Sequence, residues 1–225
     1  MYRMEIIRLS DANIEEAAAR SADVLSNGGI VLYPTDTLYG LGVESFQTPA
    51  VEKLYRVKER DLSRPIHSIV QSVEIMEMFA TVTQEAHTLA RDFLPGPLTM
   101  ILKKKPEFTS GIARGMDTIG FRIPNHLFCL ALAKVFPHPF TSTSANLSGR
   151  ETERSIGAIL DQFGPAQAEI DLVIDAGELP ESAPSTVVDL SHLGEEDGHP
   201  AIIRQGAIPV TDIWEAIGYD PGIAG

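Results

Sequence analysis

The segment Tyr33–Gly42, YPTDTLYGLG, holds a dense group of side chains that could contact a ligand. Thr35, Asp36, Thr37 and Tyr39 place three hydroxyls and a carboxylate within five positions, and two glycines follow. Glycine lets a backbone approach another group closely. The segment therefore suits a polar turn that closes on a ligand after a buried strand, although an ordinary polar surface loop has the same composition.

Three cationic side chains lie at positions where they could bind an anion. Lys58 and Arg60 lie two positions apart at the end of a predicted helix, and Arg122 interrupts an apolar strand. The first two could simply complement the helix dipole, or they could point at a phosphate or carboxylate, with Arg binding in a bidentate manner. Arg122 either reaches water at an edge of the sheet or is held to bind an anion.

A second polar segment, Thr141–Gly149 (TSTSANLSG), follows an apolar run and provides five hydroxyls and an amide. Such groups suit a ribose, a phosphate or an amino acid, while a turn stabilised by Ser and Thr or a helix cap is the alternative. The chain has no GxxxxGK[ST], HExxH or GxSxG motif. Gly40-Leu41-Gly42 begins a dinucleotide fingerprint, but Ser45 occupies its third glycine position.

The composition limits the class of protein. The net charge of −13 over 225 residues argues against a broad basic nucleic-acid surface, but a local basic pocket acts within a Debye length of about 8–10 Å. The single Cys129 excludes an intrachain disulfide and a Cys-cluster zinc site. No apolar run suits a membrane span and the N-terminus lacks a signal-peptide core, so we expect a cytoplasmic protein.

Strands and helices alternate along the whole chain, which indicates one α/β or α+β domain over residues 1–225 with a large mixed sheet. We expect the chain to fray over residues 219–225. The predicted strands are Met4–Leu9, Gly29–Tyr33, Ile66–Val70, Leu98–Leu102, Thr118–Ile123, Phe140–Thr143, Leu172–Ile174, Thr186–Leu190 and Ala201–Arg204. The predicted helices begin at Ser10 or Asp11, Thr48, Ser72, Thr83, Asn125, Ser155 and Thr211.

Taken in order, several segments resemble the YrdC/TsaC-like threonylcarbamoyl-adenylate synthases. These segments are YPTDTLYGLG, KER followed by Pro65, LPGPLTMIL, IGFRIP, STSANLSG, STVVDL and IIRQGAI, from Ile30 to about Ile208. The resemblance implies a twisted open sheet around a deep concave cleft, with a recognisable core over about residues 10–208. It also implies an enzyme that joins L-threonine, bicarbonate and ATP, with Mg²⁺, into threonylcarbamoyl-AMP and pyrophosphate. A separate complex then transfers the threonylcarbamoyl group to tRNA.

The resemblance assigns roles residue by residue. It implies that Lys58, Arg60, Ser144 and Asn146 form the catalytic signature around the nucleotide, and that Thr37, Arg122, Ser142 and Ser185 hold threonine. It adds Arg64, Thr118, Thr152 and Arg204 as further ATP contacts, while the Mg²⁺ arrives with ATP and takes no protein ligand.

The chain departs from the family pattern at two positions. Asp36 stands where many members have Glu, and Ile69 stands where many have a histidine near threonine; His67 lies two residues earlier on the same strand face. These changes favour a YciO-like protein that binds double-stranded RNA or nucleotide with little synthase activity, whereas the intact SAN loop favours a synthase. A module that binds RNA in the same cleft and a carbamoyl-transfer enzyme acting on carbamoyl phosphate stay open.

Overall fold

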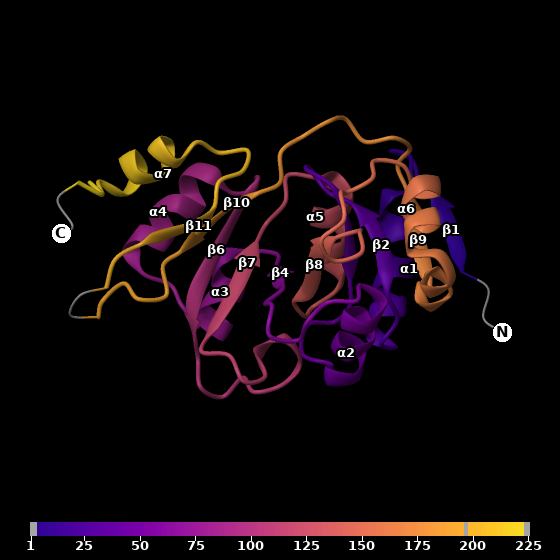
Figure 1. The fold of residues 1–225 in the computed structure, drawn as a ribbon, viewed down its shortest axis with the longest axis horizontal. Helices are drawn as coiled ribbons and strands as arrows, with labels where there is room; N and C mark the ends of the chain where they lie inside the picture. Colours follow the sequence, from indigo (N-terminus) through magenta and orange to yellow (C-terminus); the bar gives the residue numbers. More distant parts are fainter. Residues whose placement is uncertain (1–3, 196–197, 223–225) are drawn as a thin grey trace.

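One mixed sheet of eleven strands organises the computed structural model, which describes residues 4–195 and 198–222 (Figure 1). Ten strands follow the order β1-β9-β2-β3-β8-β4-β7-β6-β10-β11, and β5 pairs with β6 outside this path. The bounds are β1 Glu5–Arg8, β2 Val31–Pro34, β3 Tyr39–Gly42, β4 His67–Ile69, β5 Ala80–Thr81, β6 Leu98–Lys104, β7 Thr118–Arg122, β8 Phe140–Ser144, β9 Leu172–Asp175, β10 Thr186–Asp189 and β11 Ala201–Arg204. Parallel pairs such as β4 with β7 and antiparallel pairs such as β6 with β7 occur together, so the predicted mixed α/β sheet is confirmed.

Helices cover the sheet along its length. They are α1 Ile14–Ser26, α2 Thr48–Val57, α3 Val73–Phe79, α4 Gln84–Phe93, α5 Leu127–Val135, α6 Ile156–Phe163 and α7 Val210–Ile217, with short 3₁₀ turns η1 Gly111–Ala113 and η2 Gly164–Glu169. Across residues 4–195 and 198–222, none of these helices has the length and apolar character to cross a membrane.

Side-chain cap bonds are present at two of the predicted helix starts, whereas α1, α2, α3 and α7 begin without one. Thr83 and Ser155 accept hydrogen bonds from backbone N–H groups at the starts of α4 and α6, as predicted. The prediction for α5 was wrong by one residue, because Nδ1 of His126 accepts the cap bond from the N–H of Phe128. The N–H of Asn125 instead donates to the carboxylate of Asp36. This neighbour is 89 positions away in the chain and has no local sequence signal.

The polar turn predicted after β2 leads directly into the hairpin strand β3, which was missed. Its two glycines looked like turn residues, but both lie in the strand, and at Gly42 a larger side chain would not fit. A Cβ on Gly42 would lie 2.7 Å from the ring of Tyr33 and 2.9 Å from the carbonyl of Thr141. The buried Tyr33 ring therefore occupies the space that side chains of β3 would need.

Two apolar clusters hold the elements together. The smaller one lies between the sheet and the helices α1 and α5, and it includes Tyr33, Ile69, Phe128 and Phe140. The larger one packs on the opposite face of β2 and β9, continues along the sheet, and includes residues of α2, α4, α6 and α7. Side chains alternate between the two faces of a strand, so the face that carries Ile69 and Phe140 also carries His67 and Ser142.

The predicted tail begins within the described chain. The ring of Tyr219 lies 5.1 Å from that of Trp214 in an edge arrangement, and its N–H donates to the Trp214 carbonyl. Residues 223–225 of the predicted tail lie outside the described residues.

Candidate active site

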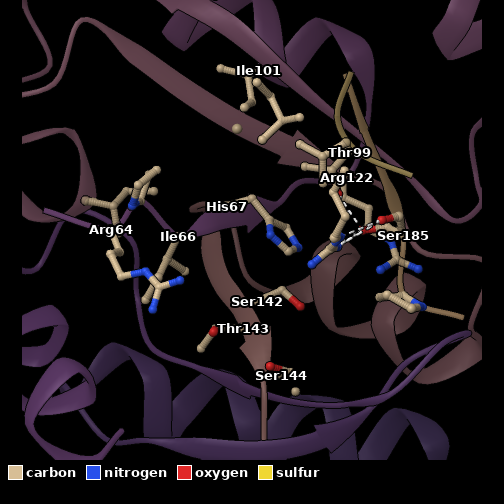
Figure 2. A pocket seen from close by; sticks show the side chains of 18 of the residues that line it. Arg64, Ile66, His67, Thr99, Ile101, Arg122, Ser142, Thr143, Ser144 and Ser185 are labelled. Carbon is tan, nitrogen blue, oxygen red and sulfur yellow. Dashed lines mark hydrogen bonds between the residues drawn. The ribbon is translucent and has the colours of Figure 1, made fainter. Parts of the chain in front are cut away.

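A cavity of about 550 Å³ opens on the central strands of the sheet (Figure 2). Alternate residues of neighbouring strands point into it, as the period of two along a strand requires. They include Ser142 and Ser144 of β8, His67 of β4, Thr118, Gly120 and Arg122 of β7, Thr99 and Ile101 of β6, and Ser185 and Val187 at β10. Polar groups from distant parts of the chain thus meet on one surface.

The cavity wall is strongly cationic. Arg60, Arg64, Arg122 and Arg204 all line it, and among the described residues no Asp or Glu does. Arg60 donates to the carbonyls of Arg64 and Pro65, and Arg204 donates to the carbonyl and hydroxyl oxygens of Ser185. These bonds to neutral oxygens orient the guanidinium groups without neutralising them, so the cavity favours an anionic ligand.

Arg122 is the one of these arginines that has a carboxylate partner in the described chain. It pairs with Asp36 at 2.5 Å, and it also donates to the hydroxyl of Thr37 at 3.1 Å and to the carbonyl of Gly96 at 3.2 Å. Both partners of the ion pair are largely buried, with 4% and 12% of their side chains exposed. The shorter acid Asp36 thus fixes both the strand residue Arg122 and the turn that carries Thr37.

Hydroxyl groups line the part of the cavity that contains Arg122. The hydroxyl of Thr99 lies 3.0 Å from that of Ser185, and the cavity surface also includes Thr37 and Ser142. The connection between β9 and β10 passes beside these groups. Its Ser182 hydroxyl donates to the Thr37 carbonyl at 2.5 Å, and the Tyr39 hydroxyl donates to the Gly177 carbonyl at 2.7 Å.

Lys58 lies beneath the cavity instead of lining it. Only 1% of the residue is exposed, and its ammonium donates to the carbonyls of Ser144 and Asn146 and lies 3.4 Å from the Asn146 side-chain oxygen. Burial, together with the positive charge of Arg60, lowers the pKa of Lys58 to about 7. Lys58 therefore holds the end of β8 in place from behind.

Asn146 belongs to the same support. Its side-chain oxygen accepts from the hydroxyl of Ser144 at 2.5 Å, and its amide donates to the carbonyl of Arg150 at 2.6 Å. The predicted catalytic set Lys58, Arg60, Ser144 and Asn146 thus divides into two pairs. Arg60 and Ser144 face the cavity, and the other two position Ser144.

The remaining predicted residues mostly converge. Thr37, Arg64, Thr118, Arg122, Ser142, Ser185 and Arg204 line the cavity, whereas Thr152 does not. Thr152 follows the loop after β8, and the structure gives no hydrogen bond to its side chain in the described chain. Placing such a residue requires the path of that loop, which its sequence does not specify.

His67 lies two residues before the position at which many family members have a histidine. In the structure it lines the cavity with β4 in regular pairing, while Ile69 is buried in the cluster under α5. The buried Nε2 atom of His67 has no hydrogen-bond partner among the described residues. The available signal was a polar residue at the first position of a short strand, two residues after Pro65.

The comparisons with known proteins agree with this geometry. The family model Sua5_yciO_yrdC, described as telomere recombination, matches residues 23–206. The chain belongs to this family. The threonylcarbamoyl-AMP synthase of Pyrococcus abyssi is 33% identical over 217 residues, which cover 96% of this chain and 62% of that protein. A putative threonylcarbamoyl-AMP synthase of Methanocaldococcus jannaschii is 36% identical over 213 residues, covering 93% of this chain and 96% of the relative.

A solved structure of a family member gives a matching fold. The crystal structure of P. abyssi Sua5 complexed with L-threonine superposes with a TM-score of 0.81 at 31% identity, covering 98% of this chain and 63% of that one. This chain therefore spans less than two thirds of the Pyrococcus protein and nearly all of the Methanocaldococcus relative.

Proposed function

We propose that this protein is an L-threonylcarbamoyladenylate synthase, a nucleotidyltransferase that uses ATP. The observation that carries the proposal is the carboxylate-free cavity, in which Arg60, Arg122 and Arg204 meet the hydroxyls of Thr37 and Ser142. Such a surface suits a polyphosphate and a carboxylate together. The synthase names of the relatives that share this family support the same activity and favour it over the YciO-like alternative.

The two ends of the cavity suggest how the substrates divide it. Thr37, Arg122, Ser142 and Ser185 would hold threonine, because Arg122 retains guanidinium N–H groups beyond those bonded to Asp36, Thr37 and Gly96. Arg60, Arg64, Thr118 and Ser144 would hold ATP, and Arg204, which is bonded to Ser185, would reach the phosphates from the threonine side. Lys58 and Asn146 would contribute by fixing Ser144, and Thr152, which does not line the cavity, has no part in the proposed ATP contacts.

The mechanism follows from the residue types. The threonine amine attacks the carbon of bicarbonate, and loss of water gives an N-carboxy adduct. A carboxylate oxygen of this adduct then attacks the α-phosphorus of ATP, and pyrophosphate leaves. Arg60, Arg64 and Arg204 offset the charge that develops on the phosphates, and holding the reactants in contact can supply about 7–11 kcal/mol. No protein nucleophile is needed.

Magnesium is expected with ATP. Among the described residues no cluster of three His, Cys, Asp or Glu side chains could hold a metal ion, and no carboxylate lines the cavity. The residues present therefore fit an ion whose oxygen ligands are phosphates and water. Bound in this way, Mg²⁺ would neutralise charge on the leaving pyrophosphate.

The experiment that tests the proposal measures pyrophosphate release by the purified protein. We expect release only when ATP, threonine and bicarbonate are all present, and omission of any one should abolish it. Pyrophosphate release that does not depend on threonine would contradict the proposed function. Calorimetry with threonine and a non-hydrolysable ATP analogue, added singly and together, would show whether the two share one site.

The wider setting is also a proposal. We place the protein in the cytoplasm, where a separate complex would transfer the threonylcarbamoyl group to tRNA. Binding of double-stranded RNA or tRNA to the cavity is supported only by its arginines and is opposed by the net charge of −13. Such binding would weaken steeply with added salt, which distinguishes it from the synthase reaction.

A further inference from the structure

The cavity offers no counter-ion for an ammonium group. Its charged side chains are Arg60, Arg64, Arg122 and Arg204, and its other ionisable side chains are Tyr39 and His67. The nearest acid that the described contacts show is Asp36, whose two oxygens are bonded to Arg122 and to the N–H of Asn125. A positively charged amine would therefore find guanidinium groups and no carboxylate on the cavity wall, which disfavours its charged form.

His67 lies at the amino-acid end of this cavity. Its Cα is paired with that of Ser142 on β8, and the ring points between Ser142 and Arg122 in Figure 2. On the other side lies Gly120 of β7, where an added Cβ would be 3.0 Å from the Cβ of His67. Glycine at position 120 thus leaves the imidazole its place on the cavity wall.

The imidazole of His67 is uncharged and incompletely hydrogen bonded. Burial and the charges of Arg122, Arg204 and Arg60 lower its pKa to about 3. A neutral imidazole has one N–H donor and one lone-pair acceptor, yet the buried Nε2 has no partner among the described residues. Because buried polar groups are rarely left unpaired in proteins, this atom calls for a ligand group.

We propose that the amino-acid substrate binds here as the free amine and that the neutral imidazole of His67 accepts a hydrogen bond from it. This inference rests on the proposed function. A half-turn about the Cβ–Cγ bond exchanges the nitrogen and carbon edges of the ring, so the ring can turn its acceptor nitrogen to the ligand. The ammonium loses its proton to solvent on binding. The amine keeps its lone pair, which is the form that attacks bicarbonate.

The first test pairs a change in the protein with the matching change in the ligand. Calorimetry would measure the affinity of the wild type and of His67→Leu for threonine and for (R)-3-hydroxybutanoate, which lacks only the amine. We expect His67→Leu to weaken threonine binding about 10-fold and to leave the affinity for 3-hydroxybutanoate within about twofold. His67→Gln, which retains a neutral acceptor, should keep most of the threonine affinity.

Equal effects of His67→Leu on both ligands, or no effect on either, would overturn the role of His67. His67→Ala serves as the second apolar variant if the leucine variant fails to fold, and circular dichroism checks the fold of each. If the wild type binds no threonine, the proposed function itself fails. If the wild type binds threonine and His67 has no influence, only the present inference fails.

The second test counts protons. Titrating threonine into the wild type at pH 7, in buffers with different ionisation enthalpies, should reveal release of about one proton per threonine bound. The affinity should also rise with pH until the free amino acid loses its own proton. Binding without proton release would mean that the ammonium form is bound, and the inference would be wrong.

Discussion

Replacing Lys58 by methionine removes a buried charge while keeping most of the side-chain volume. The lysine is 1% exposed, and burial with the charge of Arg60 lowers its pKa from 10.5 to about 7. In the unfolded chain the lysine keeps its proton up to about pH 10.4. Between these two values the unfolded state binds more protons than the folded state, so the free energy of unfolding rises with pH.

The size of this effect follows from the same numbers. A fall in the pKa of Lys58 from 10.5 to about 7 corresponds to roughly 5 kcal/mol of unfolding free energy at 1.36 kcal/mol per pKa unit. The oxygens of Ser144 and Asn146 that bind the ammonium offset part of the burial cost, so this figure is an upper bound. Between pH 7 and 9 the free energy of unfolding of the wild type should rise by up to roughly 2–3 kcal/mol relative to that of Lys58→Met.

Denaturant titrations of both proteins at several pH values between 6 and 9.5 measure this difference. Lys134→Met is the matched control, because Lys134 is an exposed residue of α5, and its unfolding curve should move in parallel with that of the wild type. If the free energies of the wild type and Lys58→Met also change in parallel with pH, Lys58 is charged in the folded protein well above pH 7. The reasoning from its burial would then be refuted.

Three further predictions concern the cavity. Arg60→Ala should lower pyrophosphate release by about 100-fold or more without changing the melting temperature; near-normal turnover would remove Arg60 from the site, and Arg114→Ala is the exposed control. Asp36→Asn breaks the buried pair with Arg122 and should lower the free energy of unfolding by about 3 kcal/mol, measured by urea denaturation; an unchanged value would show that the pair is not needed. Thr152→Val should leave the affinity for an ATP analogue within about twofold, since Thr152 does not line the cavity; a large calorimetric loss would show that the loop closes on the nucleotide.

The sequence was sufficient for the features that depend on local pattern. Apolar runs bounded by turn residues located most strands, and hydroxyl caps such as Thr83 located helix starts. Because side chains alternate along a strand, Arg122 and Ser142 point from their strands into the cavity. These features depend on a few neighbouring residues, and each of those neighbours is visible in the chain.

Features set by distant neighbours could not be predicted in this way. Position 42 in β3 requires glycine because the ring of Tyr33 occupies the space that a side chain would need. Lys58 turns under the cavity because the carbonyls at the end of β8 bind it, and a KxR spacing does not show which way a lysine points. His67 faces the cavity only because β4 pairs with β8 in this register.

The connection from Ala176 to Ser185 joins strands that lie near opposite edges of the sheet, β9 and β10. These ten residues contain no helix or strand, and fully extended they would span about 35 Å. The connection therefore has a fixed maximum length, and it passes the cavity residue Thr37, whose carbonyl accepts from the hydroxyl of Ser182. Its length limits how far β9 and β10 could move apart, and inserting flexible residues between Ala176 and Ser185 would relax that limit without altering a residue of either strand.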